Sequence, residues 1–174
     1  MLKEISNVNP KNIFLFSDPH FDHINIIGLC HRPFGNVNQM NETILRNFNK
    51  VVRDSSLVYF LGDMAYGRNS KSYSCWFKQL NGHIIKLRGN HDTRGFRETV
   101  IHVGDLYFKL VHNPHNSGDW NGWIIHGHVH NKSPFIDFKN KRVNVSVDVT
   151  KFRPVRLSYI LKIIRDSIWE RIGK

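Results

Sequence analysis

The feature that most constrains the fold is a series of short apolar runs, separated in the first half of the chain by helical patterns. The runs at 12–17 and 56–63, and the start of 83–92, are typical of buried strands. Between them, residues 37–52 place apolar side chains at helical spacing, and residues 70–80 are expected to form a second helix. Strands that alternate with helices predict βαβ units and a largely parallel central sheet.

The second half of the chain carries strand-like runs with shorter connections and less helix between them. These runs span 105–114, 122–130 and 142–150, and a hairpin is expected around Gly104. Residues 157–172 place their apolar side chains on one stripe, which predicts an amphipathic helix docked on a sheet. The expected fold class is therefore α/β, a two-sheet β-sandwich flanked by helices, with the first half mostly parallel and the second half mixed.

Length and composition agree with an ordinary globular protein. The chain has 174 residues, of which 40% are hydrophobic and 22% charged, and we expect a single domain over 1–174. No apolar run approaches the ~18 residues that span a membrane, and the N-terminal segment lacks the apolar region of a secretory signal. Cys30 and Cys75 form neither a disulfide framework nor a CxxC zinc motif. A reducing, cytoplasmic location without membrane contact is expected, and the sequence leaves the oligomeric state open.

The charge balance points to an anionic partner. The formal net charge is +11, which favours a nucleic acid, a nucleotide or another phosphate ester. Charge alone does not separate a polymer from a small anion. The chain also contains 11 histidines, which invites a search for metal ligands and for acid–base groups.

Five of the strand-like runs end in side chains that can bind metal ions. In chain order these are Asp18 and His20, then Asp63, then Asn90 with His91 and Asp92, then His112, and finally His128 and His130. Open α/β sheets place their sites at the carboxyl ends of strands. The donors outnumber the ligands of one tetrahedral zinc ion and suit two cations that share a bridging carboxylate. Mixed imidazole and oxygen ligation favours Mn, Fe, Zn, Co or Ni over calcium or magnesium, and we expect two divalent ions, Mn²⁺ first.

The order of these motifs resembles the calcineurin-like metallophosphoesterases. The matching segments are Asp18-Pro19-His20, Gly62-Asp63, Gly89-Asn90-His91-Asp92, His112 and Gly127-His128-Val129-His130. The resemblance spans most of the chain, and the chain is similar to small single-domain members of this family. It implies the calcineurin-like phosphoesterase fold, with the metal site at the strand ends. It also implies a hydrolase in which a hydroxide between two metals attacks phosphorus.

The resemblance also implies a role for each matching residue. One ion would be bound by Asp18, His20 and His130, the other by Asn90, His112 and His128, and Asp63 would bridge the two. His91 would be catalytic, stabilising the phosphoryl oxygens or protonating the leaving group. Asp92 would orient His91, as carboxylates often orient imidazoles near metals.

Three further residues near the motifs have weaker support. His23 and Arg32 follow the first motif closely and are expected to contact substrate phosphate or base, although a solvated loop explains them equally well. His126 shares the strand face of His128, yet the motif does not use it, so we expect it to pack beside the ligands. We also expect the backbone to leave strand geometry at Gly127, because His128 and His130 would serve different metals.

Two departures from the phosphoprotein phosphatases weaken a protein phosphatase interpretation. The second motif reads GDMAYGRN where those enzymes have Gly-Asp-x-Val-Asp-Arg-Gly, and the third ends in Asp92 where they have Glu. Because the chain is short, we expect an open site, which suits phosphodiesters of nucleotide or nucleic-acid type. The alternatives are a phosphomonoesterase acting on nucleotides or proteins, a non-catalytic metal-binding scaffold of the same fold, and a nucleic-acid-binding protein with one structural metal.

Overall fold

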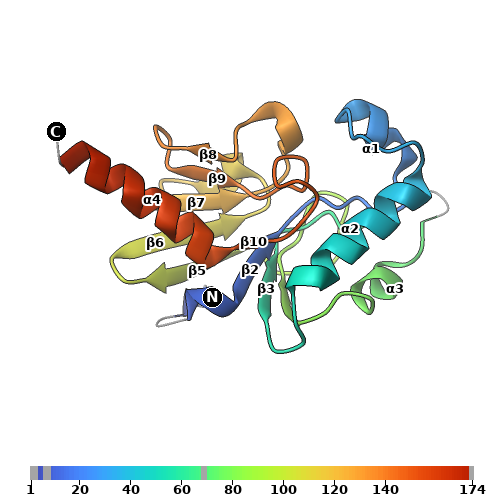
Figure 1. The fold of residues 1–174 in the computed structure, drawn as a ribbon, viewed down its shortest axis with the longest axis horizontal. Helices are drawn as coiled ribbons and strands as arrows, with labels where there is room; N and C mark the ends of the chain where they lie inside the picture. The colour runs from blue at the N-terminus through green and yellow to red at the C-terminus, as the bar shows by residue number, and fades with distance from the viewer. Residues whose placement is uncertain (1–3, 6–8, 68–69, 173–174) are drawn as a thin grey trace.

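The computed structural model describes residues 4–5, 9–67 and 70–172 (Figure 1). Its strands are β1 (Glu4–Ile5), β2 (Ile13–Phe16), β3 (Leu57–Phe60), β4 (His83–Lys86), β5 (Glu98–Val103), β6 (Leu106–Val111), β7 (Trp123–His126), β8 (Ile136–Asp137), β9 (Arg142–Asn144) and β10 (Val155–Arg156). Its α-helices are α1 (Ile24–Leu29), α2 (Val37–Val51), α3 (Tyr73–Phe77) and α4 (Leu157–Ile172). Short 3₁₀ helices are η1 (Pro10–Asn12), η2 (Pro114–Ser117) and η3 (His130–Lys132).

The smaller sheet has the order β10-β2-β3-β4 over the described residues. Strands β2, β3 and β4 are parallel and in register, with Phe14 beside Val58 and Val58 beside Ile84. Strand β10 joins β2 in the antiparallel direction. The parallel strands were predicted, and their shared direction brings the residues that follow β2, β3 and β4 to one edge of the sheet.

The larger sheet has the order β1-β5-β6-β7-β9-β8 over the described part of the chain. Strands β6, β7 and β9 are parallel, as are β1 and β5, whereas β5 runs antiparallel to β6 and β8 antiparallel to β9, which confirms a mixed second half. The predicted hairpin is also confirmed, since β5 and β6 meet at Gly104, whose φ is 60°. Ser17 and Ser146 form a parallel bridge that joins the ends of the two sheets.

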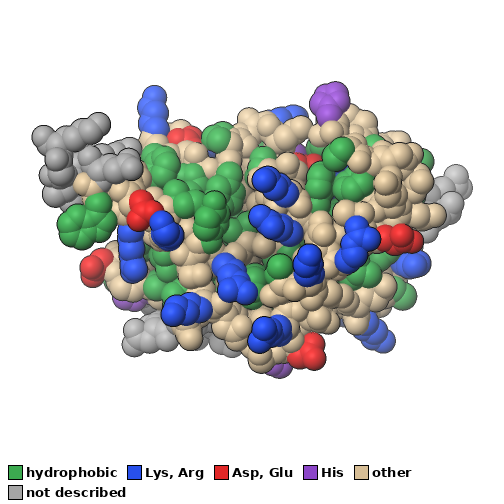
Figure 2. Space-filling view, viewed as in Figure 1, with side chains coloured by type: hydrophobic (Ala, Val, Ile, Leu, Met, Phe, Trp, Pro, Cys, Tyr) green, Lys and Arg blue, Asp and Glu red, His purple; other side chains and the backbone are tan. Residues whose placement is uncertain are grey.

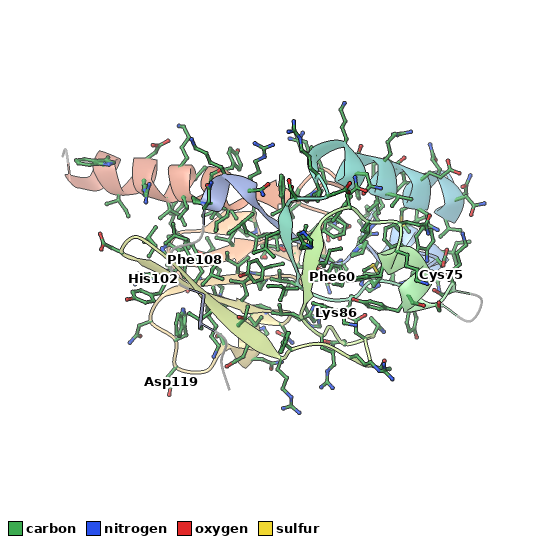
Figure 3. The ribbon with its side chains drawn as sticks, turned by 90° about the horizontal axis from the view of Figure 1, so that it is seen from below. Phe60, Cys75, Lys86, His102, Phe108 and Asp119 are labelled. Carbon is green, nitrogen blue, oxygen red and sulfur yellow. The ribbon has the colours of Figure 1, made fainter. Side chains whose placement is uncertain are left out.

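The apolar core has two layers, one on each face of the smaller sheet. Ile13 and Leu15 point into the layer between the two sheets, while Phe14 and Phe16 point into the layer under the helices, as strand alternation requires. Figure 3 shows Phe108 of β6 and Phe60 of β3 inside the molecule, and both are fully buried. The structure is thus an α/β sandwich of two sheets flanked by helices.

The helices that cover the sandwich follow the apolar spacing of the sequence. Helix α2 matches the predicted 37–52 and begins at Asn36, whose side chain accepts a hydrogen bond from the Gln39 amide. Helix α4 covers the predicted 157–172. Its residues Leu157, Ile160, Leu161 and Ile164 pack into the layer between the sheets, whereas Ile168 is 42% exposed. In the described part of the chain no helix is both long and apolar enough to cross a membrane.

Three predicted elements are shorter in the structure. The helix expected over 70–80 begins only after Ser72, which caps it, and ends at Phe77. The strand runs expected at 122–130 and 142–150 stop at His126 and Asn144. The residues that follow these strands turn sharply, because they surround the candidate site rather than continue the sheets.

Candidate metal centre

The predicted ligands meet at one end of the sandwich, where the strands β2, β3, β4, β6 and β7 terminate. The described residues contain four groups of acidic, histidine or cysteine side chains whose ligand atoms lie within 4.8 Å of one another. The members of these groups are Asp18, His20 and His130; Asp18, Asp63 and His112; His20, Asp63 and His91; and Cys30, His130 and Asp148. Buried Asp and His clusters that could bind metal are therefore present at the predicted position.

Asp63 lies at the centre of these groups. Its Oδ2 atom is 3.5 Å from His20 Nε2 and 3.3 Å from His112 Nε2. Its Oδ1 atom accepts a hydrogen bond of 2.9 Å from the His91 amide. One carboxylate oxygen therefore lies close to two imidazole nitrogens, as a shared ligand of two cations would need.

The imidazoles around Asp63 leave nitrogen atoms without hydrogen bonds. His112 donates from Nδ1 to the Leu61 carbonyl at 2.7 Å, which turns its Nε2 toward Asp63. Among the described residues, neither His112 Nε2 nor the ring nitrogens of His20 have a hydrogen-bond partner, although all are buried. Buried polar atoms without partners are costly. The donor set fits a divalent transition metal, because neutral imidazole and carboxylate are its usual ligands.

The backbone around the site adopts a rarely populated conformation. Ten non-glycine residues of the described chain have positive φ, and five of them are predicted ligands. These are Asp18, His20, Asp63, His128 and His130, with φ between 50° and 68°. Such a conformation costs ~1–3 kcal/mol per residue and is concentrated at functional sites. Five candidate ligands are therefore held in a backbone conformation that non-glycine residues rarely adopt.

Two glycines allow these loops to approach one another. A Cβ atom at Gly127 would overlap Ser17 and the Asp18 carboxylate, and one at Gly89 would overlap Asp63. Strand β7 ends at this point, and η3 begins three residues later at His130. The predicted departure from strand geometry at Gly127 is confirmed, and its cause is the close approach to Asp18.

Hydrogen bonds tie the loops to one another across the strand ends. The His128 amide donates to the Asp18 carboxylate at 3.0 Å, and the Gly127 amide donates to the His112 carbonyl at 3.0 Å. The His20 amide donates to the Asp63 carbonyl at 3.2 Å. Loops from four strands therefore position one another without help from a ligand.

A second carboxylate, which the sequence did not single out, supports His130. Asp148 Oδ2 accepts a 2.7 Å hydrogen bond from His130 Nδ1, which leaves Nε2 of His130 available. Ser146 donates to the same oxygen at 3.0 Å. Arg32 binds Asp148 through Nε at 2.8 Å and Nη2 at 3.0 Å. A carboxylate behind a metal-binding histidine fixes the ring and its tautomer. The signal in the sequence was one acidic residue within the otherwise apolar and polar run VNVSVDVT.

The electrostatics of the site differ from residue to residue. Burial lowers the pKa of His20 to about 2, so this ring is neutral. Burial also opposes protonation of His112, but the nearby carboxylates of Asp63 and Asp18 raise its pKa to about 9. In the same way, Asp148 outweighs burial and raises the pKa of His130 to about 10. A metal that bound His112 or His130 would therefore displace a proton.

The rim of the site carries an aromatic contact that the sequence did not predict. His91 is exposed, and its ring centroid lies 5.4 Å from that of His20 and 4.2 Å from that of Tyr66. Tyr66 is 46% exposed and also meets His23, at 4.7 Å. His23 is half-buried and borders His20 at 5.4 Å. The three rings line one edge of the site, and of these only Tyr66 was not named from the sequence.

Asn90 and His128 lie on the more open side. Asn90 is exposed, and His128 is half-buried with its ring centroid 5.1 Å from that of His112. A cavity of about 670 Å³ adjoins this side. It is lined by Arg88, Asn90, Arg97, His112, Asn113 and Asn116, among others. The cavity is large, polar and continuous with two of the predicted ligands.

Two predicted roles need correction. Arg32 was expected to contact substrate, but it is only 4% exposed, and its guanidinium binds Asp148 and the carbonyls of Asp18 and Pro19. It therefore supports the site from beneath. Asp92 was expected to orient the His91 ring, but its carboxylate accepts hydrogen bonds from the amides of Asp63, at 2.7 Å, and Gly89. A carboxylate between two loop amides fixes the loops that carry the candidate ligands rather than one ring.

His126 packs beside the ligands, as expected. It is buried, and Nδ1 donates to the Gly127 carbonyl at 2.9 Å. Burial lowers its pKa to about 4, so the ring is neutral at pH 7.

Comparison with known proteins places the chain in a family whose characterisation is incomplete. No protein-family model matches the chain. Over 161 residues it is 47% identical to MJ1445, an uncharacterised protein of Methanocaldococcus jannaschii, and the match covers 88% of this chain and 92% of that protein. The chain belongs to the family of MJ1445.

Solved structures support the fold of this MJ1445 family member. AQ665, a protein of unknown function from Aquifex aeolicus, matches with a TM-score of 0.70 and 26% identity, over 87% of this chain and 98% of its own. A more remote match is YfcE, a phosphoesterase from E. coli, with a TM-score of 0.49 and 16% identity over 77% of each chain. The likeness to YfcE is too remote to carry an argument.

Proposed function

We propose that this MJ1445 family member is a calcineurin-like metallophosphoesterase that uses two divalent ions to hydrolyse phosphate esters, with phosphodiesters of nucleotide or nucleic-acid type preferred. One observation carries the proposal: Asp63 Oδ2 lies between the Nε2 atoms of His20 and His112, at 3.5 and 3.3 Å. Bridging carboxylates of this kind belong to paired metal sites that clamp a phosphoryl group.

The proposed ligands divide into two sets around Asp63. Asp18, His20 and His130 would bind one ion, and Asn90, His112 and His128 would bind the other. Support for the first set comes from its mutual proximity and from Asp148 behind His130. Support for the second comes from the unpaired Nε2 of His112 and the neighbouring ring of His128. We propose Mn²⁺ first, since the donors mix imidazole with oxygen. When bound, such ions neutralise phosphoryl charge and lower the pKa of water toward neutrality.

His91 is the proposed catalytic residue of the chain itself. Its ring is exposed at the rim, and its amide donates to Asp63, so the ring lies next to the candidate ligands and would be open to a substrate. From there the imidazole can donate a proton to the leaving oxygen or a hydrogen bond to the phosphoryl group. The contact with Tyr66 limits the directions in which the ring can turn.

The preference for diesters rests on the surroundings of the site. The cavity beside Asn90 and His112 carries the guanidinium groups of Arg88 and Arg97, and in the described chain these groups form no ion pair or hydrogen bond. A phosphodiester carries an organic substituent on both sides of phosphorus and needs room for both, whereas a monoester needs room for one. The net charge of +11 acts in the same direction.

The test is an activity panel with added Mn²⁺ that compares aryl phosphodiesters, aryl phosphomonoesters, cyclic nucleotides and phosphopeptides. His91→Ala should lower turnover by about 10²–10⁴-fold while two metals per chain remain by elemental analysis. His102→Ala, a half-buried histidine on β5, serves as the matched control and should retain full turnover. Hydrolysis of monoesters alone would reassign the substrate class. No hydrolysis of any ester, or a single inert zinc ion, would refute the proposal.

A further inference from the structure

A groove of about 380 Å³ lies on the side of the molecule along which both α2 and α4 run (Figures 1 and 3). Val51 at the end of α2 and Tyr159 in the first turns of α4 form opposite parts of its lining. Strand β10 and the segment 149–154 complete it, over a floor that includes Phe14. The groove is separate from the candidate metal ligands, none of which lines it.

The groove is basic. Lys151, Arg153 and Arg156 line it, all three are exposed, and no acidic side chain is among the lining residues. Figure 2 shows that Lys and Arg side chains gather across the middle of this face, while acidic side chains lie toward its edges. Within the described residues, Lys151 and Arg153 form no ion pair and no side-chain hydrogen bond. The positive charge is therefore available to an anionic partner.

Aromatic rings lie among these charges. Tyr159 is 55% exposed, and its ring stacks on that of Phe135 with an interplanar angle of 26° and 6.2 Å between centroids. Arg156 lies over the ring of Phe14 at 5.2 Å. Exposed aromatic rings between basic side chains are the usual platform for stacked bases beside a bound phosphate backbone.

The loop that forms one wall is rigid and also supports the metal centre. The amides of Val149 and Phe152 donate to the carbonyls of Ser146 and Val147, and the ring of Phe152 packs on that of Phe34 at 4.8 Å. Three residues before Lys151, Asp148 in the same loop binds His130. One short segment therefore presents charge to the groove and fixes a candidate metal ligand.

From these observations we infer that the groove binds single-stranded DNA, with phosphates on Lys151, Arg153 and Arg156 and bases stacked on Tyr159. The binding itself does not require the metal centre, but its purpose, to bring a strand to the site for hydrolysis, rests on the function proposed above. A duplex has its bases turned inward and cannot use the stacking platform. RNA is disfavoured, because its 2′-hydroxyls would lose water against apolar lining residues such as Val149, Pro154 and Val155.

The experiment measures fluorescence anisotropy of a labelled oligo-dT of about 12 nucleotides with the intact protein in EDTA. Binding is expected to weaken with salt. In the double variant Lys151→Glu/Arg153→Glu, affinity should fall by about an order of magnitude, and the salt dependence should be shallower by about 1.4, because each phosphate contact on a single strand contributes ~0.7. The matched control is Lys78→Glu/Lys139→Glu, which makes the same charge change at exposed residues outside the groove and should leave the salt slope unchanged.

A second pair of variants tests the stacking platform. Tyr159→Ala should weaken binding about five-fold or more, whereas Tyr159→Phe should bind as the unaltered protein does, since the ring is kept. Three outcomes would overturn the inference. They are an equal loss of affinity in the groove and control charge variants, tighter binding of the matching duplex or RNA, and equal competition by polyglutamate or anionic vesicles. DNA binding in EDTA without hydrolysis in Mn²⁺ would support DNA binding by the groove and would refute the proposed function.

Discussion

The two halves of the candidate metal centre are built differently. On one side, His130 is fixed by Asp148, and Asp148 is fixed by Ser146 and by two nitrogens of the buried Arg32. On the other side, Asn90 is exposed and His128 is half-buried, beside a cavity of about 670 Å³. We call these the supported side and the open side.

The difference shows how one site can combine rigidity with access. The supported side is formed by charges that are buried together and bonded to one another, which holds the His130 ring in one orientation. The open side faces the cavity, which gives a substrate room to reach the candidate ligands. Removing a group from the supported side should therefore cost stability, and removing one from the open side should not.

The largest expected effect follows from breaking the buried pair. Arg32→Leu leaves the Asp148 carboxylate buried with one fewer cation, and should lower the free energy of unfolding by about 3–5 kcal/mol. Urea denaturation of the metal-free protein measures it. Arg88→Leu, at an exposed arginine on the open side, is the matched control and should change stability by less than about 0.5 kcal/mol. Similar losses for both arginines would contradict the comparison.

The next effect concerns metal affinity. Asp148→Asn removes the charge that orients His130 and should weaken one of two metal-binding events by about 10–100-fold, with little change in the other. Titration calorimetry with Mn²⁺ at pH 7 separates the two events. Asp105→Asn, at an exposed aspartate in the turn between β5 and β6, makes the same charge change and should leave both affinities intact. Equal weakening of both events would show that the two halves are not independent.

Mild acid should destabilise the protein through its buried neutral histidines and should not weaken the His130–Asp148 pair. His126 has a folded-state pKa near 4 and His20 one near 2, both below the ordinary value of 6.5, so the unfolded chain binds more protons below pH 6.5. Stability of the metal-free protein should fall from pH 7 to pH 5, by up to about 2 kcal/mol for each ring.

The His130–Asp148 pair behaves in the opposite way. The pKa of His130 is raised to about 10, so its stabilisation is fully present below pH 6.5 and is lost only as pH rises through the folded pKa. His126→Asn should therefore remove about half of the acid sensitivity between pH 7 and 5, as measured by thermal unfolding in EDTA. An unchanged pH profile in this variant would assign the sensitivity elsewhere.

The smallest effect is expected at the wall of the cavity. Asn116 is exposed, and we expect Asn116→Ala to change the free energy of unfolding by less than about 0.5 kcal/mol and both Mn²⁺ affinities not at all. A loss comparable to that of Arg32→Leu would mean that the cavity wall, too, supports the fold.

The features that could be predicted from the sequence are those that depend on residues close together in the chain. Strands β2, β3 and β4 and helices α2 and α4 follow from apolar periodicity, which depends on residues a few positions apart. The candidate ligands after each strand could be named because parallel strands bring their carboxyl ends to one edge. The early ends of β7 and β9 could not be predicted, because the residues that follow them form the loops around the site.

The sequence by itself determined the two-sheet α/β architecture and the set of donors at its strand ends, because period and residue type are local properties. Only the tertiary structure decided which charge meets which. Arg32 and Asp148 are separated by 116 positions in the chain, yet they form one buried pair behind His130. Asp92 binds loop amides instead of its neighbour His91, because the fold brings the Asp63 amide to it from 29 positions away. Such pairings depend on how the loops pack together, and no local pattern records that.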